Sequence, residues 1–387
     1  MRSDLTWTDY IVRGGLPHTA RKLERGEPVT VAFIGGSVTV GAGASDPGKT
    51  GYRALLADYL RRTYPRSEFA FVNAAIGGTD STYGAFRLKA HALDKASVDL
   101  LFVEFAVNDA GDKEASVRAM EGIVRRTMRT GPTTELCLLY TANETGVARF
   151  AEGGVPANIV HHEMVAERYG LPSVCLARAV ARIIGAGDMR WSDFSRDSVH
   201  PNDRGHRLYA DYLEAFLSRV LTKTGDDNGG TEAADLPPPL DPFCYERGEL
   251  AIPNGSVHAP GWRELPGWSA DRVCNWKPPA DIVLGDEPGA PLVLRFDGTA
   301  AGIAFLAGMD TGSIEVAVDE GPYRTVELFD RYCTQFYRPK AVVLADGLPP
   351  GSHTLAIRIS ENKHADSTGR SLRLLYGMVN GSFLGWE

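Results

Sequence analysis

The chain has 387 residues, of which 43% are hydrophobic and 23% are charged, and its formal net charge at pH 7 is −8. This composition is typical of a globular protein, and the length favours two domains over one. The acidic balance argues against a nucleic-acid-binding protein, because such a protein needs a basic surface for the phosphate backbone. The composition does not exclude a small neutral or cationic molecule as the substrate.

The N-terminal segment has neither the apolar core of a signal peptide nor a stretch long enough to span a membrane. The five cysteines are scattered and include no Cys-x-x-Cys pair: Cys137, Cys175, Cys244, Cys274 and Cys333. We therefore expect a cytoplasmic protein with reduced cysteines, without structural zinc and without a membrane partner.

Five short apolar runs predict the strands of a parallel sheet: 29–36, 69–76, 100–107, 136–142 and 172–177. The runs are continuous rather than alternating, as expected for strands that are buried on both faces. Helical patterns occur at 52–60, 117–128, 156–170 and 208–220. Since strands and helices alternate, we expect an α/β fold with helices on both faces of the sheet.

The pattern changes after "TKTGDDNGGTEAADLPPPLDP", residues 222–242, which predicts a linker or a strap. Short strands separated by Gly, Pro and Asp turns follow, and "VDEGPYRTV" predicts a hairpin. We expect a catalytic domain at 1–225, a linker at 226–242 and a jelly-roll-like antiparallel β-sandwich at 243–387.

The consecutive prolines of "DLPPPLDPF" favour a stiff linker, so we expect the two domains to pack against each other. Aromatic residues that follow are candidates for this interface: Phe243, Tyr245, Trp262, Trp268 and Trp276. Stacking of these side chains on sugar rings is the alternative.

Chemically useful residues follow three of the predicted strands. Ser37 ends "VTVAFIGGS", Gly77-Gly78 lies in "NAAIGGTDS", and Asn108 ends "FVEFAVN". After the fifth strand, "RWSDFSRDSVHPNDRGH" contains Asp197 three residues before His200. Because the carboxyl ends of parallel strands meet at one edge, we expect these residues to converge there.

This set suits acyl transfer. A serine nucleophile needs a base, here His200, and Asp197 would orient the imidazole. The oxyanion would be bound by the N–H groups of Ser37 and Gly78 and by the amide of Asn108. Alternatives are Gly77 in place of Gly78, a helix cap for Asp197 and a turn role for Asn108.

The four blocks, in this order, resemble the SGNH/GDSL hydrolase superfamily. The resemblance covers about residues 28–221 and rests on Ser37, Gly78, Asn108 and His200, with Asp197 from the Asp-x-x-His block. It implies a flavodoxin-like sheet and a serine esterase without metal or organic cofactor. Two blocks depart from the usual pattern, because "GGS" lacks the aspartate before the serine and "AVND" lacks the glycine; both make a lipase assignment less safe.

The added β-sandwich resembles the layout of some carbohydrate esterases, so we expect removal of an acyl group, most simply acetyl, from a sugar, an oligosaccharide or another small molecule. Asp80, Arg87, Trp191 and Phe194 flank the blocks and are candidates for lining the substrate pocket. Two alternatives remain: a non-catalytic glycan-binding protein with a vestigial site, and a glycoside hydrolase, which needs two flanking carboxyl groups.

The carboxyl candidates for a glycoside hydrolase are Glu104, Asp80 and Asp193. We expect Glu104 to be paired structurally, because a carboxylate in an apolar run is costly otherwise. Asp109 is expected in a turn or cap. Three histidines, His161, His162 and His206, are expected to be surface or packing residues rather than parts of the site.

Overall fold

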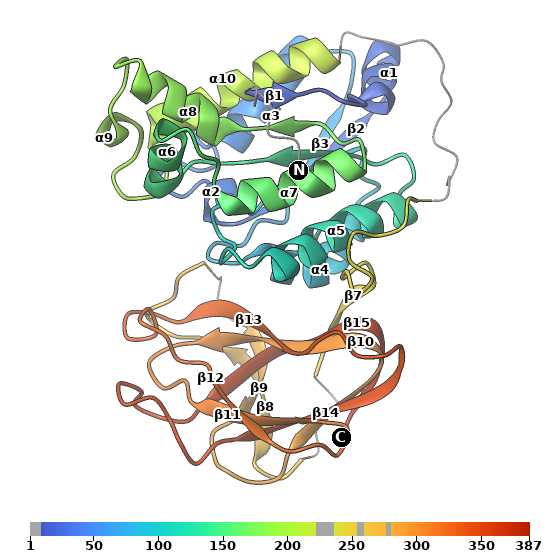
Figure 1. The fold of residues 1–387 in the computed structure, drawn as a ribbon, viewed down its shortest axis with the longest axis vertical. Coiled ribbons are helices and arrows are strands. Elements are labelled where there is room, and N and C mark those ends of the chain that lie inside the picture. Colours follow the sequence, from blue (N-terminus) through green and yellow to red (C-terminus); the bar gives the residue numbers. More distant parts are fainter. Residues whose placement is uncertain (1–8, 222–235, 254–258, 276–279) are drawn as a thin grey trace. The chain divides into compact units, whose positions relative to one another are not determined.

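The computed structural model describes residues 9–221, 236–253, 259–275 and 280–387 and divides into two compact units (Figure 1). Within these ranges, one unit comprises residues up to 84 and 91–244, and the other comprises 85–90 and 245–387. The expected domain bounds at 225 and 243 stay a prediction. Residues 226–235 of the expected linker, and Trp276, lie outside the described residues.

In the described part of the chain, the first unit is built on a six-stranded sheet in the order β1-β6-β5-β4-β2-β3. Strands β2 to β6 are parallel, and only β1 runs antiparallel, at the edge beside β6. The bounds are β1 (Tyr10–Ile11), β2 (Val29–Gly35), β3 (Phe69–Asn73), β4 (Leu100–Glu104), β5 (Glu135–Leu139) and β6 (Ser173–Val174). The parallel strands follow the flavodoxin-like order, so the predicted fold class is confirmed.

Helices cover both faces of this sheet. Figure 1 shows α3 and α10 over one face and α5 and α7 over the other, and each pair is in contact. The bounds are α1 (Pro17–Arg25), α2 (Ser37–Val40), α3 (Tyr52–Thr63), α4 (Ser81–Leu88), the π-helix η1 (Lys89–Leu93), α5 (Lys113–Thr130), α6 (Glu144–Ala151), α7 (Ala157–Arg168), α8 (Leu176–Gly185), α9 (Trp191–Phe194) and α10 (Asp203–Val220). The two central strands β2 and β4 are almost wholly buried, which explains their unbroken apolar sequences.

The proline-rich end of the expected linker lies along α5 and α7. The carboxylate of Glu121 accepts hydrogen bonds from the N–H groups of Leu240 (2.6 Å) and Asp241 (2.9 Å). The guanidinium of Arg125 donates to the carbonyl oxygen of Pro237 at 2.7 Å, and that of Arg168 donates to the carbonyl oxygen of Pro238 at 2.7 Å. The described part of this segment is therefore a strap on the first unit.

The second unit contains, among its described residues, nine antiparallel strands joined into one sheet. Their bounds are β7 (Gly248–Ala251), β8 (Trp262–Trp268), β9 (Ala280–Gly285), β10 (Leu292–Ala307), β11 (Ser313–Val318), β12 (Arg324–Glu327), β13 (Arg338–Ala345), β14 (Gly351–Ile359) and β15 (Leu372–Trp386). Strands β11 and β12 form the predicted hairpin.

The long strands β10 and β15 fold this sheet over its own core. The first half of β10 pairs with β14 and its second half with β13, and register shifts interrupt its pairing with β15 near Gly298. Such irregularities let one strand contribute to two layers. The predicted antiparallel β-sandwich is thereby confirmed.

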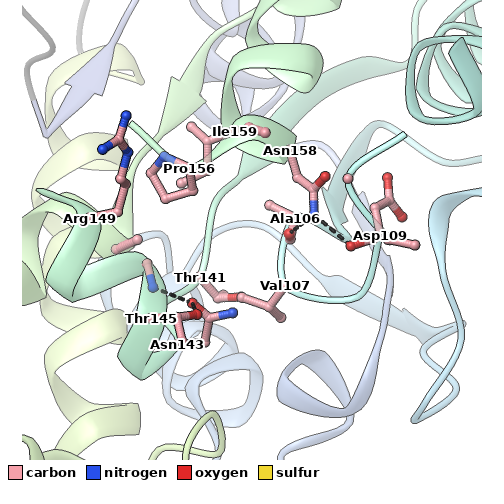
Figure 2. A pocket seen from close by; sticks show the side chains of 15 residues that line it. Ala106, Val107, Asp109, Thr141, Asn143, Thr145, Arg149, Pro156, Asn158 and Ile159 are labelled. Atoms are coloured by element: carbon pink, nitrogen blue, oxygen red, sulfur yellow. Dashed lines mark hydrogen bonds between the residues drawn. The ribbon is translucent and has the colours of Figure 1, made fainter. Parts of the chain in front are cut away.

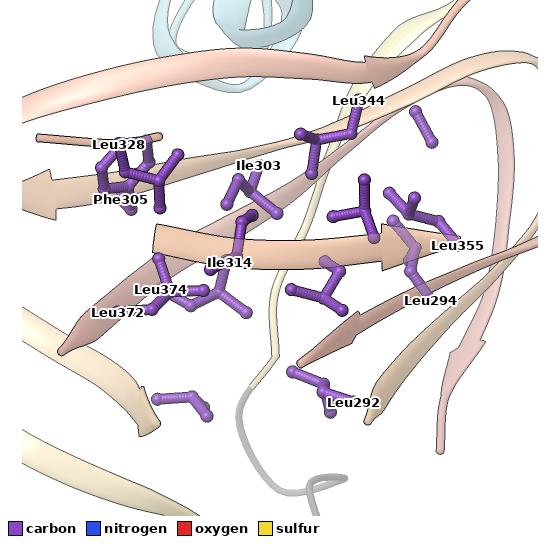
Figure 3. Packing of buried hydrophobic residues seen from close by; sticks show 14 of the residues in the cluster. Leu292, Leu294, Ile303, Phe305, Ile314, Leu328, Leu344, Leu355, Leu372 and Leu374 are labelled. Carbon is purple, nitrogen blue, oxygen red and sulfur yellow. The ribbon is translucent and has the colours of Figure 1, made fainter. Parts of the chain in front are cut away.

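Figure 3 shows the apolar side chains that meet between the layers of this unit. Fully buried examples are Leu294, Phe305 and Ile314, and each contributes roughly 1.5–3 kcal/mol by leaving water. Trp262 belongs to this core, whereas Trp268 lies against the Arg373 guanidinium at 4.8 Å. The expected packing of the two domains on each other stays a prediction. None of the described helices is long and apolar enough to cross a membrane.

Candidate active site

Ser37 is the first residue of α2 and is separated from the end of β2 only by Gly36, at the carboxyl edge of the sheet. The two glycines before it are required by close packing. A Cβ on Gly35 would crowd the side chain of Thr39 and the backbone of Glu104, and a Cβ on Gly36 would collide with the amide of Asn108. The glycine pair therefore lets a buried strand turn sharply and leave the serine half-exposed at its end.

The loop before α10 brings His200 and Asp197 to Ser37. The Nε2 atom of His200 lies 2.8 Å from Ser37 Oγ, and its Nδ1 atom lies 2.8 Å from Asp197 Oδ2. Asp197 Oδ1 also accepts from the N–H groups of His200 (2.7 Å) and Val199 (2.8 Å). The three predicted residues thus form a continuous chain of contacts.

Asp197 is ionised at neutral pH. Partial burial acts to raise the pKa of its carboxyl group, but the N–H groups of His200 and Val199 and the imidazole outweigh this effect, and the pKa is lowered. An ionised Asp197 accepts the Nδ1–H of His200. The tautomer that follows leaves Nε2 to accept the Ser37 hydroxyl proton.

Ser195 and Trp191 support the loop that carries Asp197 and His200, through contacts that were not predicted from the sequence. The Ser195 hydroxyl lies 2.6 Å from the carbonyl oxygen of His200, and the Trp191 indole donates to the carbonyl oxygen of Asp197 at 2.7 Å. Ser195 also forms an isolated β-bridge with Pro201. These contacts fix the backbone on both sides of the histidine.

The candidate oxyanion donors lie at the neighbouring strand ends. Asn108 follows β4, is half-buried, and has its Oδ1 against Gly36 with no hydrogen-bond partner among the described residues. Gly78 follows β3 in the left-handed conformation at φ 69°, and nearby Ile76 donates its N–H to the carbonyl oxygen of Gly35 at 3.1 Å. The structure therefore brings both turns to the end of β2. Their role as donors stays a proposal.

Asp109 fixes the turn that carries Asn108. Its buried carboxylate accepts from the N–H (2.9 Å) and hydroxyl (2.7 Å) of Ser81, from the Ser116 hydroxyl (2.8 Å), and contacts His162 Nε2 at 2.8 Å. Burial acts to raise the pKa of Asp109, but His162 and Ser81 together lower it. His162 was expected to be a surface or packing residue; it is fully buried on α7 and packs beside the site through its contact with Asp109. Its spacing of three from Ile159 and Val165 on a buried face was the available signal.

A cavity of about 300 Å³ opens at the same sheet edge (Figure 2). Its lining includes Val107 and Asp109, which flank Asn108, and Thr141 and Asn143, which follow β5. Other lining residues come from α6, α7 and the segment between them: Thr145, Gly146, Arg149, Pro156, Ala157, Asn158 and Ile159. The lining therefore mixes polar and apolar side chains and includes both chain neighbours of Asn108, whereas Ser37, Asn108 and His200 are not part of it.

The four flanking candidates lie outside the lining of this cavity. Trp191 supports Asp197, and Asp80 Oδ1 accepts the N–H of Tyr83 at 2.9 Å in the first turn of α4. Phe194 and Arg87 are fully buried, which does not favour contact with substrate. A substrate-binding role for any of the four stays a prediction.

The carboxylates considered for a glycoside hydrolase each have their own hydrogen-bond partners. Glu104 is buried and hydrogen-bonded by two threonines, and Asp193 accepts the N–H of Arg190 at 3.0 Å. These contacts give each carboxylate a structural role. Among the described residues, no three or more His, Cys, Asp or Glu side chains form a cluster suited to a metal ion.

Comparisons with known proteins agree with this geometry. Residues 33–208 match the GDSL-like Lipase/Acylhydrolase family. No curated protein matches the sequence. Among solved structures, the chain is similar to a two-domain esterase (CEX) active on acetylated mannans and co-crystallised with mannopentaose, with a TM-score of 0.75 and 22% identity over 96% of this chain and 97% of that chain.

A second structure of a two-domain esterase (CEX) active on acetylated mannans gives a TM-score of 0.73 at 22% identity, over 98% of this chain and 99% of that chain. At such identity the likeness concerns the fold, an α/β part followed by a β part. The resemblance inferred from the ordered sequence blocks is confirmed for residues 33–208, which match the model of the GDSL-like Lipase/Acylhydrolase family.

Proposed function

We propose that the protein is a serine esterase that removes an acyl group, most simply acetyl, from a carbohydrate. The observation that carries this proposal is the contact chain from Ser37 Oγ through the His200 imidazole to the Asp197 carboxylate. A hydroxyl beside a neutral, oriented imidazole is the arrangement that activates serine for attack on an ester.

The reaction takes two half-steps. Ser37 Oγ attacks the ester carbonyl carbon while its proton passes to His200 Nε2, and the oxyanion accepts hydrogen bonds from Ser37 N–H, Gly78 N–H and the Asn108 amide. The tetrahedral intermediate collapses, and the departing sugar oxygen takes the proton from His200. Water then attacks the acyl-serine, gives a proton to His200, and the second collapse returns this proton to Ser37 Oγ and releases the carboxylic acid.

The cavity beside Asn108 supports a sugar as the alcohol part of the ester. A volume of about 300 Å³ is at the lower end for small-molecule sites. Asn143, Thr145 and Arg149 offer polar groups to the cavity, and Pro156, which lies beside Arg149 in Figure 2, and Ile159 offer apolar surface. A pyranose ring has both kinds of surface. The layout shared with the two-domain esterase active on acetylated mannans favours the same substrate class.

The cysteines support a reducing compartment, as expected for a cytoplasmic enzyme. Among the described residues, none of the five cysteines takes part in a disulfide, and Cys137, Cys175, Cys244 and Cys333 are buried.

The proposal is tested with p-nitrophenyl acetate and with acetylated manno- and xylo-oligosaccharides, by measuring released p-nitrophenol and acetate. The wild-type protein should hydrolyse at least one acetylated oligosaccharide, and Ser37→Ala should not. Absence of hydrolysis of every ester by the wild-type protein would refute the esterase, and hydrolysis of p-nitrophenyl acetate only would refute the carbohydrate substrate.

A pair of arginine variants tests the cavity. Arg149 lines it and lies 3.4 Å from Glu152, whereas Arg61 on α3 has a similar i,i+3 pairing with Asp58 at 3.5 Å. Arg149→Met should raise KM for the oligosaccharide several-fold and leave p-nitrophenyl acetate hydrolysis unchanged, and Arg61→Met should change neither. Equal oligosaccharide kinetics for both variants would argue against sugar binding by Arg149.

A further inference from the structure

Glu104 is a fully buried carboxyl group beneath the nucleophile that the proposed mechanism does not use. It ends β4 and only 1% of its surface is exposed. Its Oε2 accepts from the Thr39 hydroxyl at 2.8 Å, its Oε1 accepts from the Thr141 hydroxyl at 2.7 Å, and the N–H of Gly36 donates to the same carboxyl group. The expected structural pairing of Glu104 is therefore present, and these partners decide what it does.

Two of the three donors enclose the nucleophile. Gly36 immediately precedes Ser37, and Thr39 lies two residues after it in the same four-residue helix, α2. The Thr39 hydroxyl also lies 2.9 Å from the hydroxyl of Tyr52. One carboxyl group therefore accepts hydrogen bonds from the residue before Ser37, Gly36, and from a residue after it, Thr39.

Besides Glu104, the guanidinium of Arg53 holds the end of this turn by donating to the carbonyl oxygens of Thr39 and of Val40 (3.0 Å). Helix α2 is a single turn that ends at Gly41 in the left-handed conformation, so few of its own hydrogen bonds restrain it. A catalytic group must keep its place to within about 0.5 Å. Rotation of this turn would move both Ser37 Oγ and the Ser37 N–H, which serve as nucleophile and oxyanion donor.

We propose that Glu104 is a positioning residue, which rests on the proposed esterase function: it holds Gly36 and Thr39 so that Ser37 Oγ faces His200. A displaced turn lowers the rate of attack by Ser37 and leaves weak ground-state binding of a small ester almost unchanged. Misplacement on the scale of 1 Å costs on the order of 100-fold in rate, and we expect losses of about 10- to 100-fold.

The experiment compares Thr39→Val, Thr39→Ser and Glu104→Gln in the full chain. For each variant, kcat and KM are measured with p-nitrophenyl acetate, together with the rate of Ser37 phosphonylation by a fluorophosphonate and Tm. Thr39→Val and Glu104→Gln should lower kcat and the phosphonylation rate in parallel with little change in KM. Thr39→Ser keeps the hydroxyl and should restore both rates to near wild type.

A matched control separates positioning from stability. Thr134 is another buried threonine, its hydroxyl donates to the carbonyl oxygen of Val98 at 2.7 Å, and it lies at the opposite, amino end of β5. Thr134→Val should lower Tm without changing either rate. The proposal is overturned if Thr39→Val lowers only Tm, as Thr134→Val does, or if Thr39→Ser fails to restore the rates. A wild-type protein that neither hydrolyses esters nor reacts at Ser37 would instead refute the proposed function. If Glu104→Gln does not fold, the comparison of Thr39→Val with Thr39→Ser still tests the positioning role.

Discussion

The Nε2 atom of His200 lies 2.8 Å from the Oγ atom of Ser37, although 163 residues separate the two in the chain. The parallel sheet produces this contact, because β2 ends at the carboxyl edge two positions before Ser37, and the loop after β6 and α8 returns to that edge. A contact of this length lets the imidazole take the hydroxyl proton without rearrangement.

Replacing the nucleophile should abolish the reaction and spare the fold. Ser37→Ala should lower esterase kcat by at least about 10⁴-fold, since only the oxyanion donors and binding would remain. The change removes one half-buried oxygen, so Tm should stay near the wild-type value. A fluorophosphonate should label the wild-type protein and not the variant. Near-normal turnover by Ser37→Ala would contradict the assignment.

The amide of Asn108 should act in the transition state. Asn108→Ala should cost roughly 100- to 1000-fold in kcat with little change in KM, because the oxyanion forms only as the reaction proceeds. Steady-state kinetics with p-nitrophenyl acetate separate the two parameters. An increase confined to KM would make Asn108 a substrate-binding residue.

Asp197 should act on the reaction by orienting His200. The lowered pKa of Asp197 keeps this group ionised throughout the range in which the esterase is assayed, so its carboxylate can hold the His200 Nδ1–H at 2.8 Å. Asp197→Asn should lower kcat by up to about 10⁴-fold through the wrong tautomer. Steady-state kinetics measure this loss, and a near-wild-type kcat for Asp197→Asn would exclude Asp197 as the orienting group.

The second unit should lose stability in acid through Asp330. Burial acts to raise the pKa of this carboxyl group, but Lys340 at 2.9 Å and Arg338 overcome it and hold the pKa at about 2. Because the folded pKa lies below the unfolded value of about 3.9, the stabilisation is complete above about pH 4 and disappears as the pH falls towards 2.

Asp330→Asn should therefore lower Tm at neutral pH. The expected loss in the free energy of unfolding is about 1–2 kcal/mol, because the partial exposure of Asp330 weakens its ion pairs. The difference from wild type should shrink between about pH 4 and pH 2. Asp366, which is 70% exposed and 3.8 Å from His364, supplies the control variant Asp366→Asn, with little effect at any pH. A Tm difference for Asp330→Asn that stays constant with pH would contradict the electrostatic origin.

The fold was predictable wherever one physical signal dominated. The unbroken apolar runs of β2 and β4 are buried on both faces, and the helices α3, α5, α7 and α10 carry apolar faces long enough to identify. Strand β1 has only two residues and α6 only eight, so local pattern carries little information there. The parallel arrangement also explains why Ser37, Asn108 and His200 were expected at one edge.

The supporting contacts of the site were not predictable, because they depend on distant segments. Nothing local distinguishes His162 as a partner of Asp109, or Thr141 as a partner of Glu104, since each pair joins two separate elements. Trp191 and Phe194 were expected near the site from their position in the sequence. The structure uses the first to hold a loop and buries the second against Tyr209 with ring centroids 5.5 Å apart.

The packing of Asn108 against Gly36 links two positions that a sequence pattern treats as independent. Because a Cβ at position 36 would occupy the space of the amide, an acidic residue cannot be introduced before the serine unless the asparagine also moves. In this chain, a side chain at position 36 therefore requires a compensating movement of the Asn108 side chain. A motif search that requires aspartate before the serine would overlook enzymes built in this way, whereas a search that pairs glycine at this position with asparagine after the neighbouring strand would find them.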